Sequence, residues 1–214
     1  MAKLPEPESI EQLRRIQPEI VTFKAGTEVS RVFFTDVDYP SAWNEFRYFG
    51  PTQSRFDHHR ADTHGEACSQ DRGIMYLASG GQAAKTCLAE VFQEKRVIDR
   101  NSKLPVYVGF ALDADIQLLD LSGNFVTKLG ASTAIHSGPR AKTRRWAQRL
   151  YDAYKQIDGL FYCSSMNGNA PAIALFERGA DAIPASNLIH RELRDSAMAS
   201  VVTLTAREIG YQVV

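Results

Sequence analysis

A single glutamate on a predicted helix is the clearest candidate for acid chemistry in the sequence. Residues 79–96 carry apolar side chains at helical spacing, and Glu90 falls at the flank of that apolar stripe, close to Cys87. A carboxylate at the edge of a core is partly desolvated, so it can serve as a strong hydrogen-bond acceptor or stabilise developing positive charge. A solvated helix glutamate would have the same spacing, so position alone leaves both interpretations open.

Two arginines have positions suited to binding an anion. Arg31 lies inside the predicted strand 28–34, and Arg55 opens a polar stretch directly after Ser54. An arginine within an apolar strand needs an anionic partner or access to solvent, and its planar guanidinium matches the oxygens of a phosphate. A structural ion pair would satisfy such an arginine equally well, so both alternatives stay open.

Hydroxyl and amide groups occur in or after two further predicted strands. Tyr76 lies inside the strand 74–78, where a lone tyrosine is usually part of the core and its hydroxyl needs a partner if buried. The turn after the strand 158–164 brings together Ser164 and Asn169, which could offer hydrogen bonds at one end of the sheet. The same composition is typical of a simple hairpin connection.

Histidines and basic residues form two weaker candidate sites. The histidines His58, His59 and His64 have no cysteine or acid at metal-ligand spacing, so we expect no metal site there. The predicted helix 141–157 has a cationic side, which is usually a solvated face but could grip an acidic partner or a nucleotide phosphate. That basic set consists of Arg140, Lys142, Arg144, Arg145 and Arg149.

Hydrophobic periodicity predicts the scaffold that must position these residues. Helices are predicted at 9–17, 79–96 and 141–157, and strands at 28–34, 74–78, 104–112, 115–121, 158–164 and 172–177. We expect Ser79 to cap its helix, 104–112 and 115–121 to be neighbouring strands, and 36–54 and 55–73 to be loops. A helix and an edge strand should follow residue 180. Because strands and helices do not alternate regularly, the pattern favours an α+β domain.

Length, charge and cysteine usage exclude several classes of protein. The chain has 214 residues, of which 44% are hydrophobic, which predicts one domain over 1–214. Basic and acidic residues number 25 each, so zero net charge argues against nucleic acid or an anionic membrane as the main partner. No secretory signal or membrane span is recognisable, and the widely spaced Cys68, Cys87 and Cys163 predict reduced thiols. We therefore expect a cytoplasmic protein.

The order of the candidate residues along the chain resembles the RES domain family. The segments SRVFF, SRFD, MYLA, LAEVF and DGLFYCSS followed by ALFE occur in the order typical of that family. The resemblance covers about residues 25–180, leaving 1–24 as a helical lead and 181–214 as a C-terminal extension. It implies a fold similar to the ADP-ribosyltransferases, with mixed or antiparallel sheets flanked by helices in a single domain.

The resemblance also implies a role for each candidate side chain. It assigns catalysis to Glu90, Tyr76, Arg31 and Ser164, and binding of NAD+ to Arg31, Arg55, Tyr76, Ser164 and Asn169. Glu90 would hold a ribose hydroxyl and stabilise an oxocarbenium-like transition state. The two arginines would fix the pyrophosphate. The family usually has glycine before the second arginine and asparagine after the aromatic residue, whereas this chain has Ser54 and Asp57 there.

The function implied by the resemblance is that of a toxin that degrades NAD+. It would cleave the nicotinamide–ribose bond by phosphorolysis or hydrolysis, with NAD+ as substrate, inorganic phosphate as a candidate co-substrate, and no cofactor or metal. Its partner would be an Xre-type antitoxin on a separate chain, and a homodimer is a candidate assembly. Two alternatives are a protein mono-ADP-ribosyltransferase that uses NAD+, and a non-catalytic module that binds a nucleotide or a partner protein.

Overall fold

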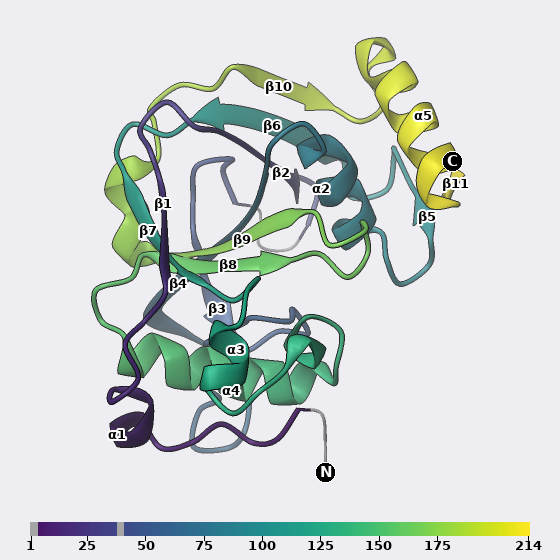
Figure 1. The fold of residues 1–214 in the computed structure, drawn as a ribbon. Helices are drawn as coiled ribbons and strands as arrows, with labels where there is room; N and C mark the ends of the chain where they lie inside the picture. Colours follow the sequence, from purple (N-terminus) through teal and green to yellow (C-terminus); the bar gives the residue numbers. More distant parts are fainter. Residues whose placement is uncertain (1–3, 38–40) are drawn as a thin grey trace.

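The described structure is built on one large mixed sheet. A computed structural model describes residues 4–37 and 41–214, so the predicted lead 1–24 and loop 36–54 each include residues outside it. The sheet has the order β1-β7-β8-β9-β4-β2-β6-β10, with β3 also paired to β4, and every pairing except β7 with β8 is antiparallel (Figure 1). Its strands are β1 (Ile20–Phe23), β2 (Glu28–Phe34), β3 (Arg47–Gly50), β4 (Cys68–Ser79), β6 (Pro105–Ala111), β7 (Ile116–Asp120), β8 (Gly159–Cys163), β9 (Pro171–Phe176) and β10 (Ile189–Glu192). The strands β5 (Val97–Ile98) and β11 (Gln212–Val213) form a separate parallel pair.

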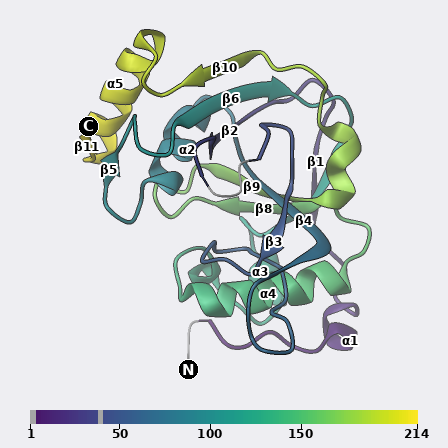
Figure 2. The same cartoon turned by 180° about the vertical axis from the view of Figure 1, so that it is seen from behind.

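Helices cover the sheet on opposite sides (Figures 1 and 2). The α-helices are α1 (Ile10–Leu13), α2 (Ala83–Val91), α3 (Phe125–Lys128), α4 (Arg140–Ala153) and α5 (Ala199–Ile209), and short 3-10 helices span Thr133–His136, Glu177–Ala182 and Ser196–Met198. Helix α1 begins with the predicted capping box, in which Ser9 and Gln12 bond each other's main chain. No helix in the described residues combines the length and apolar character needed to cross a membrane.

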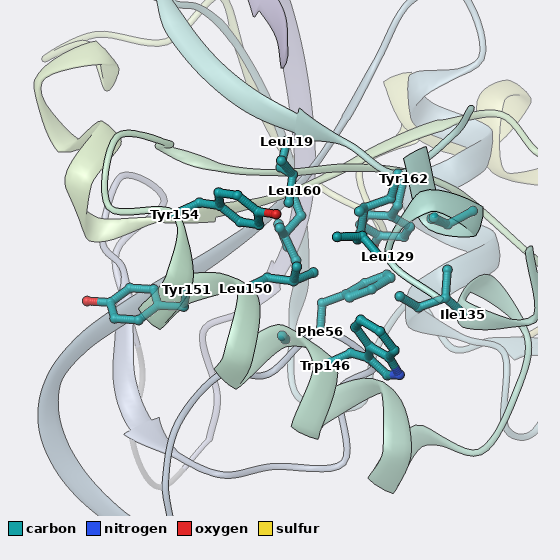
Figure 3. Packing of buried hydrophobic residues seen from close by; sticks show 14 of the residues in the cluster. Phe56, Leu119, Leu129, Ile135, Trp146, Leu150, Tyr151, Tyr154, Leu160 and Tyr162 are labelled. Atoms are coloured by element: carbon teal, nitrogen blue, oxygen red, sulfur yellow. The ribbon is translucent and has the colours of Figure 1, made fainter. Parts of the chain in front are cut away.

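Three apolar clusters hold these elements together. Trp146 and Leu150 of α4 pack with Phe56, Leu160 and Tyr162 beneath the centre of the sheet (Figure 3). A second cluster joins side chains of β2, β4, β6, β7 and β9, and a third joins α2 to α5. Because β6 and β7 share one cluster although they are far apart in strand order, the sheet must curl so that its two halves face each other.

The predicted α+β fold, a mixed sheet flanked by helices, is confirmed, but four local predictions are wrong. Residues 47–50, predicted as part of a loop, form β3, because they pair with the first half of β4. The strands predicted at 104–112 and 115–121 are not neighbours, because β6 pairs with β2 and β10 while β7 pairs with β1 and β8. Residues 68–72, predicted as loop, begin β4, because their polar side chains alternate along a half-exposed strand paired with β3. Ser79 ends β4 and does not cap α2, whose N-cap is Gln82.

Candidate active site

A cleft beside the central strand brings four of the predicted residues together. Its volume is about 710 Å³, and Arg31, Arg55, Tyr76 and Glu90 all line it. Arg31 comes from β2, Tyr76 from β4, Glu90 from α2, and Arg55 from the connection between β3 and β4. Residues that are about 60 positions apart in the sequence therefore share one concave surface, which is the usual setting of a small-molecule site.

Glu90 is held by a buried hydroxyl. On α2, Leu88 and Ala89 face the interior, so the next position along the helix falls at the rim of the core and leaves Glu90 half-buried. The Ser164 Oγ, which is fully buried, donates a hydrogen bond of 2.6 Å to Glu90 Oε1. The Met166 backbone N–H in turn donates to Ser164 Oγ at 3.2 Å. The carboxylate is therefore oriented before any ligand binds, which favours a defined role in the cleft.

Arg31 has hydrogen bonds but no ion pair among the described residues. Its Nη1 donates to the carbonyl oxygens of Trp43 at 3.3 Å and Glu45 at 3.1 Å, and its buried Nε has no partner within that part of the chain. Burial lowers the pKa of Arg31 to about 10, partly opposed by the nearby charge of Glu45. A buried guanidinium without a carboxylate is costly, and an anionic ligand would reduce that cost.

Arg55 is similar. Its Nη1 donates to the Gly138 carbonyl at 2.6 Å, just before α4, and no carboxylate lies within ion-pair distance in the described residues. Burial lowers the pKa of Arg55, and the charge of Glu90 partly opposes that effect. The cleft thus holds two arginines that the protein itself does not neutralise by direct pairing.

Tyr76 contributes a hydroxyl that is buried at the cleft. Its Oη has no hydrogen-bond partner among the described residues. Burial, more than any neighbouring charge, raises the pKa of Tyr76 far above its usual range. The hydroxyl therefore stays protonated at neutral pH and is available to donate a hydrogen bond to a bound molecule.

Ser164 and Asn169 do not line the cleft. Ser164 Oγ donates to Glu90 Oε1, so its position supports an action through that carboxylate, while its predicted contact with substrate stays a prediction. Asn169 is exposed in the β8–β9 turn, where its φ of 63° and its backbone bond to the Ser164 carbonyl serve the turn itself. The neighbouring Asn167 ties the same turn to α2 through a 2.9 Å bond to Thr86 Oγ1.

Sequence reasoning missed Gln93 and assigned no individual role to three other residues that line the cleft. Gln93 follows α2 and bonds both Glu90 and Arg140, the first residue of α4. Tyr48 and Phe49 of β3 place aromatic rings at the cleft, with exposed fractions of 43% and 47%. The basic set predicted for this helix includes Arg140, whereas the residues of β3 fell in a predicted loop and Gln93 belongs to no recognisable pattern.

A buried network shapes the connection that carries Arg55. Asp57 accepts hydrogen bonds from Arg47 Nη2 at 2.9 Å, from Thr52 Oγ1 at 2.7 Å and from His59 Nδ1 at 2.5 Å. Burial of the Asp57 carboxyl acts to raise its pKa, but these donors outweigh burial and hold the pKa well below its usual range. Asp57, one of the two positions at which this chain departs from the family pattern, is thus the centre of the network that fixes this wall of the cleft.

The histidines take part in packing. His58 and His59 are fully buried, and the His58 ring stacks on Tyr151 with 4.4 Å between ring centroids. Burial lowers the pKa of His58 to about 2, so the ring is neutral. No group of three His, Cys, Asp or Glu side chains suited to a metal ion occurs in residues 4–37 and 41–214.

Comparisons with known proteins agree with the fold described above. The family model described as RES domain matches residues 28–195. No curated protein sequence matches the chain. The chain is similar to one in the crystal structure of the M. tuberculosis MbcT–MbcA toxin–antitoxin complex, with a TM-score of 0.56 and 13% sequence identity. That similarity covers 92% of this chain and 98% of the other. At such low identity it concerns the fold, so the activity must be argued from the site.

Proposed function

The chain belongs to the RES domain family, and on that premise we propose that it is the toxin of a toxin–antitoxin pair and acts by cleaving NAD+. The observation that carries this proposal is the pairing of two guanidinium groups, each without a carboxylate partner in the described residues, with an oriented carboxylate in one cleft. Arg31 and Arg55 suit a doubly charged pyrophosphate, and Glu90 suits a ribose that becomes positively charged.

The dimensions and lining of the cleft support a dinucleotide. A volume of about 710 Å³ is within the range of cofactor and nucleotide pockets. The rings of Tyr48 and Phe49 at its edge offer flat apolar surfaces on which a purine base can stack. In the proposed complex the adenine lies against β3, the pyrophosphate between the arginines, and the nicotinamide ribose beside Glu90 and Tyr76.

The proposed reaction breaks the bond between ribose C1′ and the nicotinamide nitrogen. The bonding electron pair leaves with nicotinamide, which becomes neutral, and C1′ acquires oxocarbenium character. Glu90 accepts a hydrogen bond from a ribose hydroxyl and stabilises the positive charge, while the protonated Tyr76 hydroxyl donates to the same end of the substrate. An oxygen of inorganic phosphate or of water then bonds to C1′, and the proton that water loses in this step passes to the solvent. Nicotinamide is a good leaving group, so this chemistry calls for no metal and no covalent nucleophile.

The proposed partner is an antitoxin on a separate chain, of the Xre type. The neighbouring crystal structure is a toxin–antitoxin complex, which supports an antitoxin in general. Co-expression of the two chains, followed by purification through a tag on one of them, tests this assignment. A stable complex supports the pairing.

Incubation of purified protein with NAD+ tests the activity. We expect release of free nicotinamide, and a product carrying phosphate on C1′ if inorganic phosphate is the acceptor. Glu90→Gln keeps the side-chain size but removes the charge, and should reduce the rate by about 10³-fold, the scale of losing one electrostatic stabiliser. Its thermal unfolding should match the wild type. Absence of nicotinamide release by the folded wild type at all phosphate concentrations would contradict the proposed function.

A further inference from the structure

The catalytic carboxylate has a second hydrogen-bond donor that the sequence motifs do not include. Gln93 Nε2 donates to the Glu90 main-chain oxygen at 2.6 Å and to its Oε2 at 3.3 Å. Since Ser164 donates to Oε1, each of the two carboxylate oxygens has one donor among the described residues. The remaining acceptor positions of both oxygens are left for a ligand.

The orientation of the Gln93 amide is fixed by a cation. Arg140 Nη2 donates to Gln93 Oε1 at 2.6 Å. A guanidinium has only donors and a carboxylate has only acceptors, so the amide can satisfy both neighbours in one orientation alone, with oxygen toward Arg140 and nitrogen toward Glu90. The exposed Glu94 lies 3.6 Å from Arg140 Nη1 and so helps to hold the guanidinium near α2.

We propose that Gln93 is a positioning residue that fixes the Glu90 carboxylate for the substrate ribose, with Arg140 setting the orientation of its amide. This inference rests on the proposed cleavage of NAD+. The contact between Gln93 and Arg140 joins the start of α4 to the segment that follows α2, so two elements that are distant in the sequence act together on one carboxylate.

The location of Gln93 argues against a purely structural role. It lies two residues beyond the last residue of α2, is half-buried, and lines the cleft. Its amide satisfies a carbonyl at the end of the helix, and it also reaches the Glu90 carboxylate, which a residue that only capped the helix would not need to do. The other titratable groups with an electrostatic effect on or from Glu90 are Arg55, Tyr76, Cys87, Tyr162 and Tyr211. None of these donates a hydrogen bond to its carboxylate in the described structure.

Two substitutions separate positioning from packing. Gln93→Met keeps the volume and removes all three hydrogen bonds of the side chain. We expect kcat to fall about 10- to 100-fold, the effect of losing a bond to a charged group. Gln93→Glu keeps an acceptor for Arg140 but places a second carboxylate beside Glu90. Its kcat should fall further, and the acidic limb of its pH–rate profile should move to higher pH because like charges disfavour ionisation. Gln82→Met, an equal change at the exposed N-cap of the same helix, should match the wild type.

A second measurement keeps the test independent of turnover. The carboxyl carbon resonance of Glu90, identified by its loss in Glu90→Gln, can be followed against pH by NMR in each variant. Its transition should shift to higher pH in Gln93→Glu even if the protein does not cleave NAD+, in which case only the proposed function fails. Wild-type kcat, pH–rate profile and carboxyl titration in both Gln93 variants would overturn the positioning role.

Discussion

Helix α4 connects two charged regions that are built on opposite principles. Its first residue faces the cleft, and its last turn belongs to a group that we name the Tyr151 cluster, consisting of Arg72, Tyr151, Asp152, Glu177 and Arg178. Within the cluster, Arg72 Nη2 lies 2.9 Å from Asp152, the Tyr151 hydroxyl donates to Glu177 at 2.5 Å, and the Arg178 guanidinium lies 3.7 Å from the centre of the Tyr151 ring. Acid, base and aromatic ring thus satisfy one another.

The cleft leaves comparable groups unsatisfied. Arg31 and Arg55 contact only carbonyl oxygens by direct hydrogen bonds in the described residues, and the Tyr76 hydroxyl has no partner there. The difference teaches that burial of a charged group has two uses. Where it serves stability, the protein supplies the counter-charge, and where it serves binding, the counter-charge is left for the ligand.

Matched substitutions of one arginine from each region give the sharpest test of this contrast. Arg31→Met should lower kcat/KM for NAD+ by about 10²-fold, because a charge-assisted contact with the pyrophosphate is lost. Its free energy of unfolding should be unchanged or higher, since an unpaired buried cation is removed. Arg72→Met should keep the activity and lose about 2 kcal/mol of stability, the scale of a hydrogen bond to a charged group.

Steady-state kinetics and urea unfolding of the two variants measure both quantities. The proposed contrast is contradicted if Arg72→Met loses activity while its stability equals that of the wild type. It is also contradicted if Arg31→Met loses stability while its activity is unchanged. Lysine in place of Arg31 should recover part of the affinity, because it restores the charge without the planar pair of donors.

Acid should lower the stability of the folded protein through His58, whose ring stacks on Tyr151 of the Tyr151 cluster. Burial lowers the pKa of this histidine from 6.5 to about 2 in the folded protein. The unfolded chain therefore binds a proton below pH 6.5 that the folded protein does not, and stability falls as pH decreases through that window. Between pH 6.5 and pH 5 the loss should be roughly 2 kcal/mol.

Unfolding free energies of the wild type and His58→Phe across this range provide the check. Phenylalanine preserves an aromatic ring against Tyr151 but cannot titrate, so most of the slope should disappear. Burial also lowers the pKa of His136, which leaves a smaller slope in the variant. An undiminished slope in His58→Phe would assign the acid sensitivity to other groups.

The smallest effect is expected at the aromatic edge of the cleft. Tyr48→Ala should raise KM for NAD+ about 5-fold at unchanged kcat, since stacking of a base on one ring contributes about 1 kcal/mol. Nicotinamide mononucleotide lacks the adenosine half, so its KM should be the same for variant and wild type. If Tyr48→Ala raises KM for the mononucleotide as much as it raises KM for NAD+, Tyr48 does not act on the adenine.

The elements that could be predicted from the sequence are those that depend on local patterns of apolar and polar residues. The strand around Arg31 and the helix that carries Glu90 follow from apolar periodicity, and the order of motifs placed Arg55 and Tyr76 in the same site. The pairing of strands did not follow, because β6 and β7 have the same alternation whichever partner they take. That choice is made by the curl of the sheet, which depends on contacts between distant residues.

Individual roles within the site were equally hard to predict. The bond from Ser164 to Glu90 could not be predicted, because the direction of this side chain depends on the hairpin turn and on the anchor of that turn at Thr86. Gln93 and Arg140 are ordinary surface residue types, and only their meeting across two elements gives them a role. Neither the segment around Gln93 nor the start of α4 contains a sequence pattern that predicts this contact.

The antiparallel pairing of β4 with β9 has a consequence for translation. Ile74 to Ala78 take partners from Ala172 to Phe176, about 100 positions later, and the hydroxyl that holds Glu90 arrives with the same hairpin. While the ribosome is still extending the chain toward residue 170, the nascent polypeptide already contains both arginines and the glutamate but lacks β9, the strand that pairs with β4. Under the proposed function, the cell that makes this protein is not exposed to its activity until most of the polypeptide has emerged.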